Sequence, residues 1–175
     1  VAASEDAVKY LIEQGHREIG IICGPQDVFT SQQRQLGYAQ AFINKGIFPK
    51  QELIKYGDYT IESGYACLKE LINQNQNLSA VFVTNYEMTL GAIIATNELG
   101  IKVPEQISLI GFDNMHLAQV VKPKLTIISQ PIQKIAENVA DIMLKRLSQE
   151  KPSEAKIVNL STKLILGESV INKMI

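Results

Sequence analysis

Short apolar runs alternate along this chain with longer stretches in which apolar residues recur every three or four positions. The short runs predict buried strands at residues 19–23, 53–56, 80–84, 107–111 and 125–129. The periodic stretches predict helices at residues 4–14, 31–45, 61–73, 86–99 and 131–147, and residues 157–166 are expected to be extended. Most of the short runs are apolar on both faces, which is typical of covered parallel strands. The pattern predicts an α/β fold with a mostly parallel open sheet covered by helices on both faces.

The second predicted helix shows which of its residues should face the core. Leu36, Ala39 and Phe42 recur at helical spacing and are expected to point inward. Gly46 follows and is expected to end the helix.

Polar and aromatic residues follow the predicted strands where each one ends, and Arg34 lies early in the helix after the first strand. The carboxyl ends of parallel strands share one edge of an open sheet, and small ligands bind in the crevice along that edge. We therefore expect a small-molecule site built from Arg34, Tyr59, Asn85, Tyr86, Phe112 and Asp113.

Each of these residues also has an ordinary structural interpretation. An arginine fork can bind a diol, a carboxylate or a phosphate. The spacing of Arg34 alone favours a solvated surface residue, and only its place beside the other strand-end residues favours a ligand role. Asp113 fits a ligand role and a turn role equally, whereas Asp58, directly after a glycine, is expected to be a turn residue. Asn85 is expected to cap the following helix and can still reach a ligand from there. At least one nearby aromatic ring should pack on the flat face of a sugar or purine; the candidates are Phe29, Tyr59, Tyr86 and Phe112.

The composition excludes several classes of protein. With 175 residues, of which 46% are apolar and 20% charged, the chain has the size and balance of one globular domain. Its net charge is −1 and no cluster of lysine and arginine stands out, so the chain offers no field that attracts nucleic acid. No apolar stretch approaches the ~20 residues needed to span a bilayer. Cys23 and Cys67 are expected to be buried thiols, which fits a reducing compartment such as the cytoplasm.

Motifs of known enzyme classes are missing from the sequence. It contains no G-x-G-x-x-G fingerprint, P-loop or G-x-S-x-G elbow. His16 and His116 lack the spacing of metal ligands. His16 is expected to bond carbonyls at the end of the first helix, and His116 is expected to lie in a surface loop. We therefore expect no enzyme activity, no metal and no cofactor.

Several segments of the chain match, in the same order along the sequence, the pattern of a known protein family. They are residues 7–19 (AVKYLIEQGHREI), 34–38 (RQLGY), 57–65 (GDYTIESGY), 80–91 (AVFVTNYEMTLG), 98–113 (ELGIKVPEQISLIGFD), 123–131 (PKLTIISQP) and 164–169 (LILGES). The most specific part is VPEQISLIGFD followed by PKLTIISQP. The chain thereby resembles the lactose/galactose-repressor family of bacterial transcription regulators.

The resemblance implies a periplasmic-binding-protein-like effector domain with two lobes and a ligand between them. In that family, the positions matching Arg34, Asn85 and Asp113 contact the effector, and the position matching Tyr59 often carries an aromatic ring that packs on it. The family also forms dimers through this lobe, and the matching interface positions are Leu90, Leu117 and Val120.

Two positions depart from the family pattern. Tyr86 stands where the family usually has aspartate, which changes the rim of the pocket. Gly167 stands where the family usually has arginine, which removes a positive charge.

The resemblance also implies a division of the chain into parts. Full members of the family begin with a helix-turn-helix and a first lobe, and this chain is expected to begin about where the second lobe begins. Residues 1–128 are expected to form that C-terminal lobe, and residues 129–150 a crossover strand and helix of the first lobe. Residues 151–175 are expected to form a return strand and tail.

These observations favour one function and leave two alternatives open. The chain is expected to be the effector-binding portion of a bacterial transcription regulator, with a sugar or another small polar molecule as effector. It is expected to form a homodimer, to reach operator DNA only through an upstream helix-turn-helix, and to have no contact with a membrane. The first alternative is a periplasmic sugar-binding protein of a transporter. The second, an enzyme on an open α/β sheet, needs a catalytic set that the sequence does not show.

Overall fold

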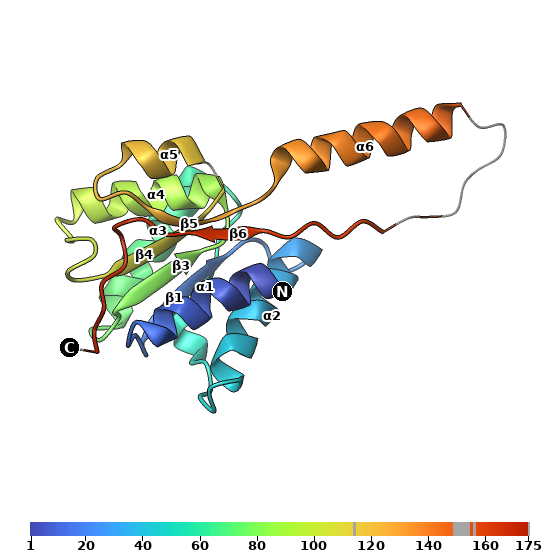
Figure 1. Cartoon of the computed structure of the whole chain (residues 1–175). Coiled ribbons are helices and arrows are strands. Elements are labelled where there is room, and N and C mark those ends of the chain that lie inside the picture. Colours follow the sequence, from blue (N-terminus) through green and yellow to red (C-terminus); the bar gives the residue numbers. More distant parts are fainter. Residues whose placement is uncertain (114, 149–154, 156, 175) are drawn as a thin grey trace. The chain divides into compact units, whose positions relative to one another are not determined.

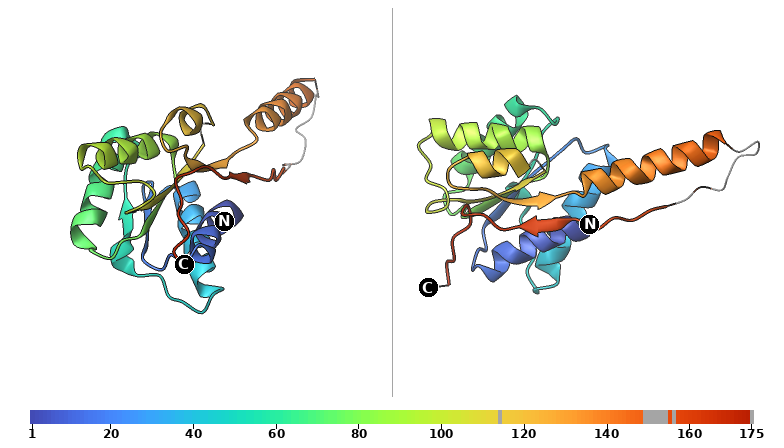
Figure 2. Two further views of the ribbon diagram at one scale, coloured as in Figure 1. Left: turned by 60° about the vertical axis from the view of Figure 1, so that its left-hand side comes forward. Right: turned by 45° about the horizontal axis from the view of Figure 1, so that its top comes forward.

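The computed structural model describes residues 1–113, 115–148, 155 and 157–174. Six strands form one sheet in the order β2-β1-β3-β4-β5-β6 (Figure 1). Their bounds are Ile19–Cys23 (β1), Ile54–Tyr56 (β2), Ala80–Val83 (β3), Ser108–Phe112 (β4), Thr126–Ser129 (β5) and Lys163–Ile165 (β6). Strands β1 to β5 pair in parallel, and the arrow of β6 runs opposite to that of β5 (Figure 2). The predicted α/β class with a mostly parallel sheet is confirmed.

Helices cover both faces of this sheet. Their bounds are Ala2–Glu13 (α1), Phe29–Ile43 (α2), Ile61–Gln74 (α3), Tyr86–Glu98 (α4), Met115–Val120 (α5) and Ile132–Leu147 (α6), with a short 3-10 turn at Gln51–Leu53. Helices α1 and α2 lie on one face of the sheet, and α3, α4 and α5 lie on the other (Figures 1 and 2).

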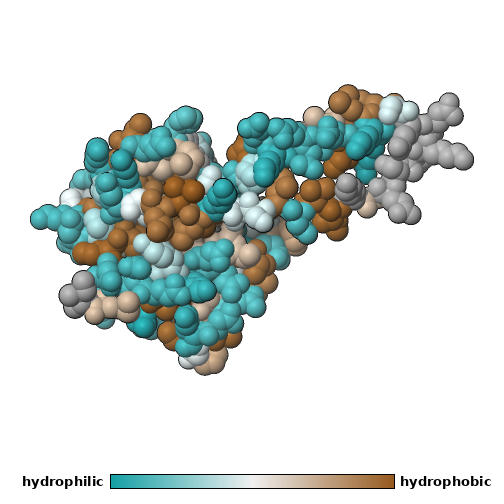
Figure 3. Space-filling model, in the orientation of Figure 1, coloured by the Kyte–Doolittle hydropathy of each residue, from teal (hydrophilic) through white to brown (hydrophobic). Residues whose placement is uncertain are grey.

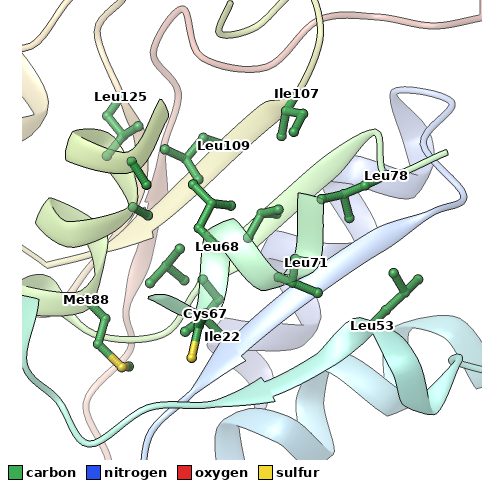
Figure 4. Packing of buried hydrophobic residues seen from close by; sticks show 14 of the residues in the cluster. Ile22, Leu53, Cys67, Leu68, Leu71, Leu78, Met88, Ile107, Leu109 and Leu125 are labelled. Carbon is green, nitrogen blue, oxygen red and sulfur yellow. The ribbon is translucent and has the colours of Figure 1, made fainter. Parts of the chain in front are cut away.

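The core has two halves because every residue of β1, β3 and β4 is buried. Ile22 packs in the half under α3 and α4, whereas its neighbour Ile21 packs in the half under α1 and α2. Figure 4 shows the first half, where Leu68 and Leu71 of α3 lie close to Ile22. Burying such a side chain stabilises the fold by about 1.5–3 kcal/mol. The two-sided packing gives the sheet a fixed edge on which loop residues can be positioned.

Two polar caps set the first turns of the helices that follow β2 and β3. The Thr60 side chain accepts a hydrogen bond from the backbone N–H of Ser63, and the Asn85 side chain accepts one from Met88. Gly91 allows α3 and α4 to approach closely, because a Cβ there would overlap the carbonyl oxygen of Ile61. The predicted cap at Asn85 is confirmed.

His16 differs from the prediction that it bonds carbonyls at the end of α1. The ring is fully buried, with Nδ1 3.0 Å from Ser79 Oγ and Nε2 3.1 Å from the carbonyl oxygen of Ile171. Arg17 instead donates to the helix-end carbonyl of Ile12, at 2.9 Å. Burial explains the difference, because a ring that leaves water must bond whatever polar groups surround it.

Two other predictions about single residues were wrong. His116 lies in helix α5 rather than in a loop, although it is exposed as expected. Leu36 is 49% exposed rather than inward, because α2 turns Gly37, Tyr38 and Phe42 toward the core.

The chain divides into two compact units. One consists of residues 1–129 and 164–175, and the other of residues 130–163. Helix α6, in the second unit, has no buried residue and carries both hydrophobic and hydrophilic residues on the side shown in Figure 3. Its exposed apolar side chains are Ile132, Val139, Met143, Leu144 and Leu147. The assignment of residues 129–150 to another lobe stays a prediction.

Within the described residues, no helix combines the length and the apolar character that crossing a membrane requires.

Candidate functional site

Arg34 reaches from the second turn of α2 to the ends of two strands. Its Nη1 donates a 2.6 Å hydrogen bond to the carbonyl oxygen of Thr84, directly after β3. Its Cζ lies 4.0 Å from the centroid of the Phe112 ring, at the end of β4. A cation over an aromatic face at this distance is attracted by the ring. Residues from three elements therefore meet at the carboxyl edge of the sheet.

The charge of Arg34 is influenced by two further predicted site residues. Burial lowers the pKa of Arg34 from its usual value, and Tyr59 and Asp113 act in the opposite direction. A guanidinium keeps its proton in proteins, so Arg34 is a half-buried cation. Both Tyr59 and Asp113 lie close enough to act on that charge.

Tyr59 and Asp113 also share an unusual backbone conformation. Their φ angles are 70° and 61°, and no other non-glycine residue in the described part of the chain has a positive φ. Such a conformation costs about 1–3 kcal/mol, and residues that adopt it cluster at functional sites, although aspartate adopts it more readily than tyrosine. The backbone N–H of Asp113 donates to the carbonyl oxygen of Ile128 in β5, at 2.7 Å, which holds this loop in place.

The Tyr59 ring rests on the backbone of Gly24, which follows β1. A Cβ at position 24 would overlap Cε1 and Cζ of that ring, so only glycine admits the ring in this position. Tyr59 Oη is buried and has no hydrogen-bond partner among the described residues. A buried hydroxyl without a partner destabilises the fold.

Asn85 and Tyr86 lie next to Thr84, the residue that receives the Arg34 hydrogen bond. Asn85 Oδ1 accepts from the backbone N–H of Met88 at 3.0 Å, and both Asn85 and Tyr86 are half-buried. The cap uses the amide oxygen, which leaves the amide nitrogen as a donor at the same edge. A role for either residue in ligand binding stays a prediction.

Asp58 is a turn residue, as the sequence indicates. Its Oδ1 accepts from the backbone N–H of Thr60 at 3.1 Å and from the Thr60 hydroxyl at 2.6 Å. The hydrogen bond from the Thr60 hydroxyl is the main cause that lowers the pKa of Asp58 to about 2, with Ser63 contributing. These bonds shape the loop that carries Tyr59.

A hollow of about 200 Å³ opens beside Arg34 and Phe112. Its lining is completed by Val1, Ala3, Ser4, Phe29, Thr30 and Gln33, and does not include Tyr59, Asn85, Tyr86 or Asp113. Thr30 and Gln33 were missed from the sequence. The signal that could have found Thr30 is its spacing of four residues from Arg34, since residues three and four apart share one side of a helix; Gln33 has no such spacing from Arg34.

A larger cavity, of about 310 Å³, contains none of the predicted effector-site residues. It is lined by the C-terminal half of α4, by the loop before β4 and by the loop between α5 and β5; the lining includes Ile93, Lys102, Leu109, Val121 and Leu125. It lies at the amino end of β4, away from the edge where Arg34 is held.

The predicted interface residues lie on α4 and α5. Leu90 and Leu117 are half-buried, and Val120 is 73% exposed. Their role in dimer formation stays a prediction.

Comparison with known proteins bears on the whole chain. Residues 8–170 match the model of the periplasmic binding protein-like domain family. The chain belongs to this family.

Several proteins similar to the chain are named as transcriptional regulators. The chain is 37% identical over 164 residues to the HTH-type transcriptional repressor PurR of Edwardsiella ictaluri, covering 94% of this chain and 48% of the repressor. The resemblance to lactose/galactose-type repressors is thereby confirmed. The chain spans about half the length of the curated relatives it matches.

Two solved structures of transcriptional regulators are similar to this chain. One is a complex of the transcriptional regulator CelR with cellobiose, at 32% identity and a TM-score of 0.88, covering 95% of this chain and 51% of that one. The other is a sugar-binding regulator of the LacI family from Escherichia coli complexed with phosphate. It has 34% identity and a TM-score of 0.84, and the match covers 97% of this chain and 60% of that one.

Proposed function

We propose that this chain is the effector-binding portion of a bacterial DNA-binding transcription regulator, and that its effector is a sugar or another small polar molecule. The observation that carries the proposal is that Arg34 lies over the Phe112 ring at the end of β4, beside Asp113 in sequence, while Tyr59, from the loop after β2, also acts on its charge. A guanidinium can donate two parallel hydrogen bonds to neighbouring hydroxyls, and a carboxylate can accept two more. The Tyr59 ring and its buried hydroxyl add a flat apolar surface and one polar contact.

The relatives support a regulator over a periplasmic transport protein, because they are named as transcriptional repressors and regulators. In this proposal the protein acts in the cytoplasm, is not an enzyme, and reaches operator DNA through a helix-turn-helix outside this sequence. Residues 1–128 serve as the C-terminal lobe, and α6 belongs to the opposite lobe. A homodimer forms through Leu90, Leu117 and Val120.

A thermal-shift screen of sugars and purines on the full-length protein tests the proposal. A ligand at 100 times its Kd stabilises the folded state by about 2.7 kcal/mol, which raises the Tm by roughly 5–10 °C for a domain of this size. The hit should lose its effect on an Arg34→Ala variant and keep it on Lys69→Ala, an exposed change on α3. Shifts that are equal in both variants would contradict the assigned site.

A further inference from the structure

The cavity of about 310 Å³ beside α4 has apolar walls. Two residues of its lining, Leu109 and Leu125, are buried and lie near each other in the core (Figure 4). Other apolar residues of the lining are half-buried, among them Ile93, Ile101 and Val121. Sites for small molecules are typically concave, mostly apolar and of about 300–1,000 Å³, with a few polar groups that orient the ligand. This cavity has the size and the walls of such a site.

Charged side chains of both signs belong to the same lining. Lys102 and Glu105 come from the loop before β4, and Lys122 comes from the loop before β5. All three are exposed, and within the described residues their side chains form no hydrogen bond and no ion pair, with each other or with another residue. Each ammonium group can donate three hydrogen bonds, and the carboxylate can only accept. Their bonding capacity therefore remains available to another molecule.

Hydrogen bonds hold both loops in position. The Lys102 N–H donates to Gln106 Oε1 at 2.7 Å, and the Gln106 N–H donates to the Lys102 carbonyl oxygen at 2.9 Å. In the second loop, the Leu125 N–H donates to the Ala118 carbonyl oxygen at 3.0 Å. A ligand that meets fixed loops has less chain entropy to remove on binding.

The end of α4 does not require the two lysines. A lysine near the end of a helix often bonds the last carbonyl groups. Here the carbonyl groups of the last turn already accept backbone hydrogen bonds, from the N–H groups of Leu99, Gly100 and Ile101. Capping of α4 therefore does not account for the position of Lys102 or Lys122.

We infer that this cavity binds a free α-amino acid with an apolar side chain. Its carboxylate lies between Lys102 and Lys122, its ammonium group faces Glu105, and its side chain enters the space beside Leu109 and Leu125. A zwitterion matches this lining, because it brings one group of each sign to a rim that holds unpaired groups of both signs. A water molecule takes about 30 Å³ in the liquid, so the cavity has room for roughly ten non-hydrogen atoms, which is the size of leucine.

This site is separate from the effector site proposed above. The lining includes none of Arg34, Tyr59 and Asp113. Leu109 lies near the start of β4, whereas Phe112, which contacts Arg34, ends that strand. The inference therefore does not depend on the proposed function.

Calorimetry on the full-length protein tests the inference with three molecules that share one apolar body. L-leucine should bind with a Kd of about 1 mM or lower. 4-Methylpentanoate lacks the ammonium group and 3-methylbutylamine lacks the carboxylate, so each should bind at least about tenfold more weakly. Equal affinity for all three would mean that the charges play no part. Absence of binding by leucine, isoleucine and phenylalanine alike would overturn the inference.

Two exposed substitutions test which charge meets which group. Lys122→Gln should weaken L-leucine and 4-methylpentanoate several-fold and leave 3-methylbutylamine unchanged, because it removes a partner of the carboxylate. Glu105→Gln should weaken L-leucine and 3-methylbutylamine and leave 4-methylpentanoate unchanged. The matched control is Lys69→Gln, an exposed lysine on α3 outside the lining, which should bind all three as the wild type does. The same affinities in all variants would contradict the assigned contacts.

Arg34→Ala separates this inference from the proposed function. Leucine should bind this variant with unchanged affinity, because Arg34 does not line the cavity. Loss of leucine binding in Arg34→Ala would place leucine at the effector site, and the inference would be wrong. If leucine binds as described while no sugar or purine binds at Arg34, the proposed effector site fails and this site stands.

Discussion

The Arg34 guanidinium lies 4.0 Å above the Phe112 ring while one of its nitrogens is bonded to the Thr84 carbonyl. These two contacts fix a long, flexible side chain before any ligand arrives. A ligand that meets an ordered arginine has less conformational entropy to remove, which favours tighter binding. The remaining guanidinium N–H groups stay available at the edge of the sheet.

Removal of either charged side chain should weaken the response to effector. In the full-length protein, Arg34→Ala and Asp113→Ala should each raise the effector Kd roughly 10- to 100-fold, because each deletes hydrogen bonds to a charged group. Operator binding without effector should be unchanged. Calorimetry and an operator-release assay measure the two properties. Normal release of DNA by both variants would show that the site is assigned wrongly.

The contact between Gly24 and Tyr59 predicts coupling between these positions. Gly24→Ala should displace the Tyr59 ring and destabilise the protein by about 1–3 kcal/mol, the usual cost of overpacking. In a Tyr59→Ala background the same change should cost much less, because the overlapping atoms are gone. Urea unfolding of the four proteins gives the coupling energy. An equal cost in both backgrounds would mean that the ring does not rest on Gly24.

Two substitutions separate the structural and binding roles of Asn85. Asn85→Ala should destabilise the protein by about 1 kcal/mol through loss of the cap to Met88. Asn85→Asp keeps the cap, since aspartate caps as well as asparagine, but it replaces the amide donor with an acceptor. We expect Asn85→Asp to retain stability and to bind effector more weakly. Wild-type affinity in Asn85→Asp would leave Asn85 with a structural role alone.

The burial of His16 predicts that the folded protein loses stability in mild acid. Burial lowers its pKa from 6.5 to about 4, with a smaller opposing effect from the Ile171 carbonyl and a small further lowering by Lys173. Between these values the unfolded chain binds a proton that the folded protein does not, so the free energy of unfolding decreases as the pH falls from about 7 to 4. The contribution is roughly 2–3 kcal/mol in total.

The control for this effect is His16→Gln, which removes the titrating group. Its stability at pH 7 should be lower, because the buried bonds to Ser79 and Ile171 are altered. Its free energy of unfolding should fall less steeply between pH 7 and 4 than that of the wild type. Parallel pH profiles would assign the acid sensitivity to other groups.

Much of the fold follows from local signals in the sequence. The strand Ile19–Cys23 appears with its predicted bounds because a continuous apolar run is closed by Gly24 and Pro25. The cap at Asn85 was predictable because asparagine before a helical pattern has one dominant role. Helix α5 was missed because a helix of six residues is too short for a periodic pattern.

The position of the candidate residues at the carboxyl edge of the sheet was predictable, but their geometry was not. The carboxyl-edge rule selects Arg34 and Asp113, since it depends only on strand order. The positive φ of Tyr59 has no local signal, because tyrosine does not favour that region. The exposure of Leu36 was missed because it depends on how α1 docks against α2, which periodicity alone does not determine.

The most direct test of the whole account is a crystal structure of the full-length protein with the ligand found by thermal shift. We expect ligand oxygens within about 2.7–3.2 Å of the Arg34 guanidinium and the Asp113 carboxylate, with the ligand in contact with the Tyr59 ring. A ligand bound elsewhere, for example in the 310 Å³ cavity beside α4, with Arg34 and Asp113 untouched, would contradict it.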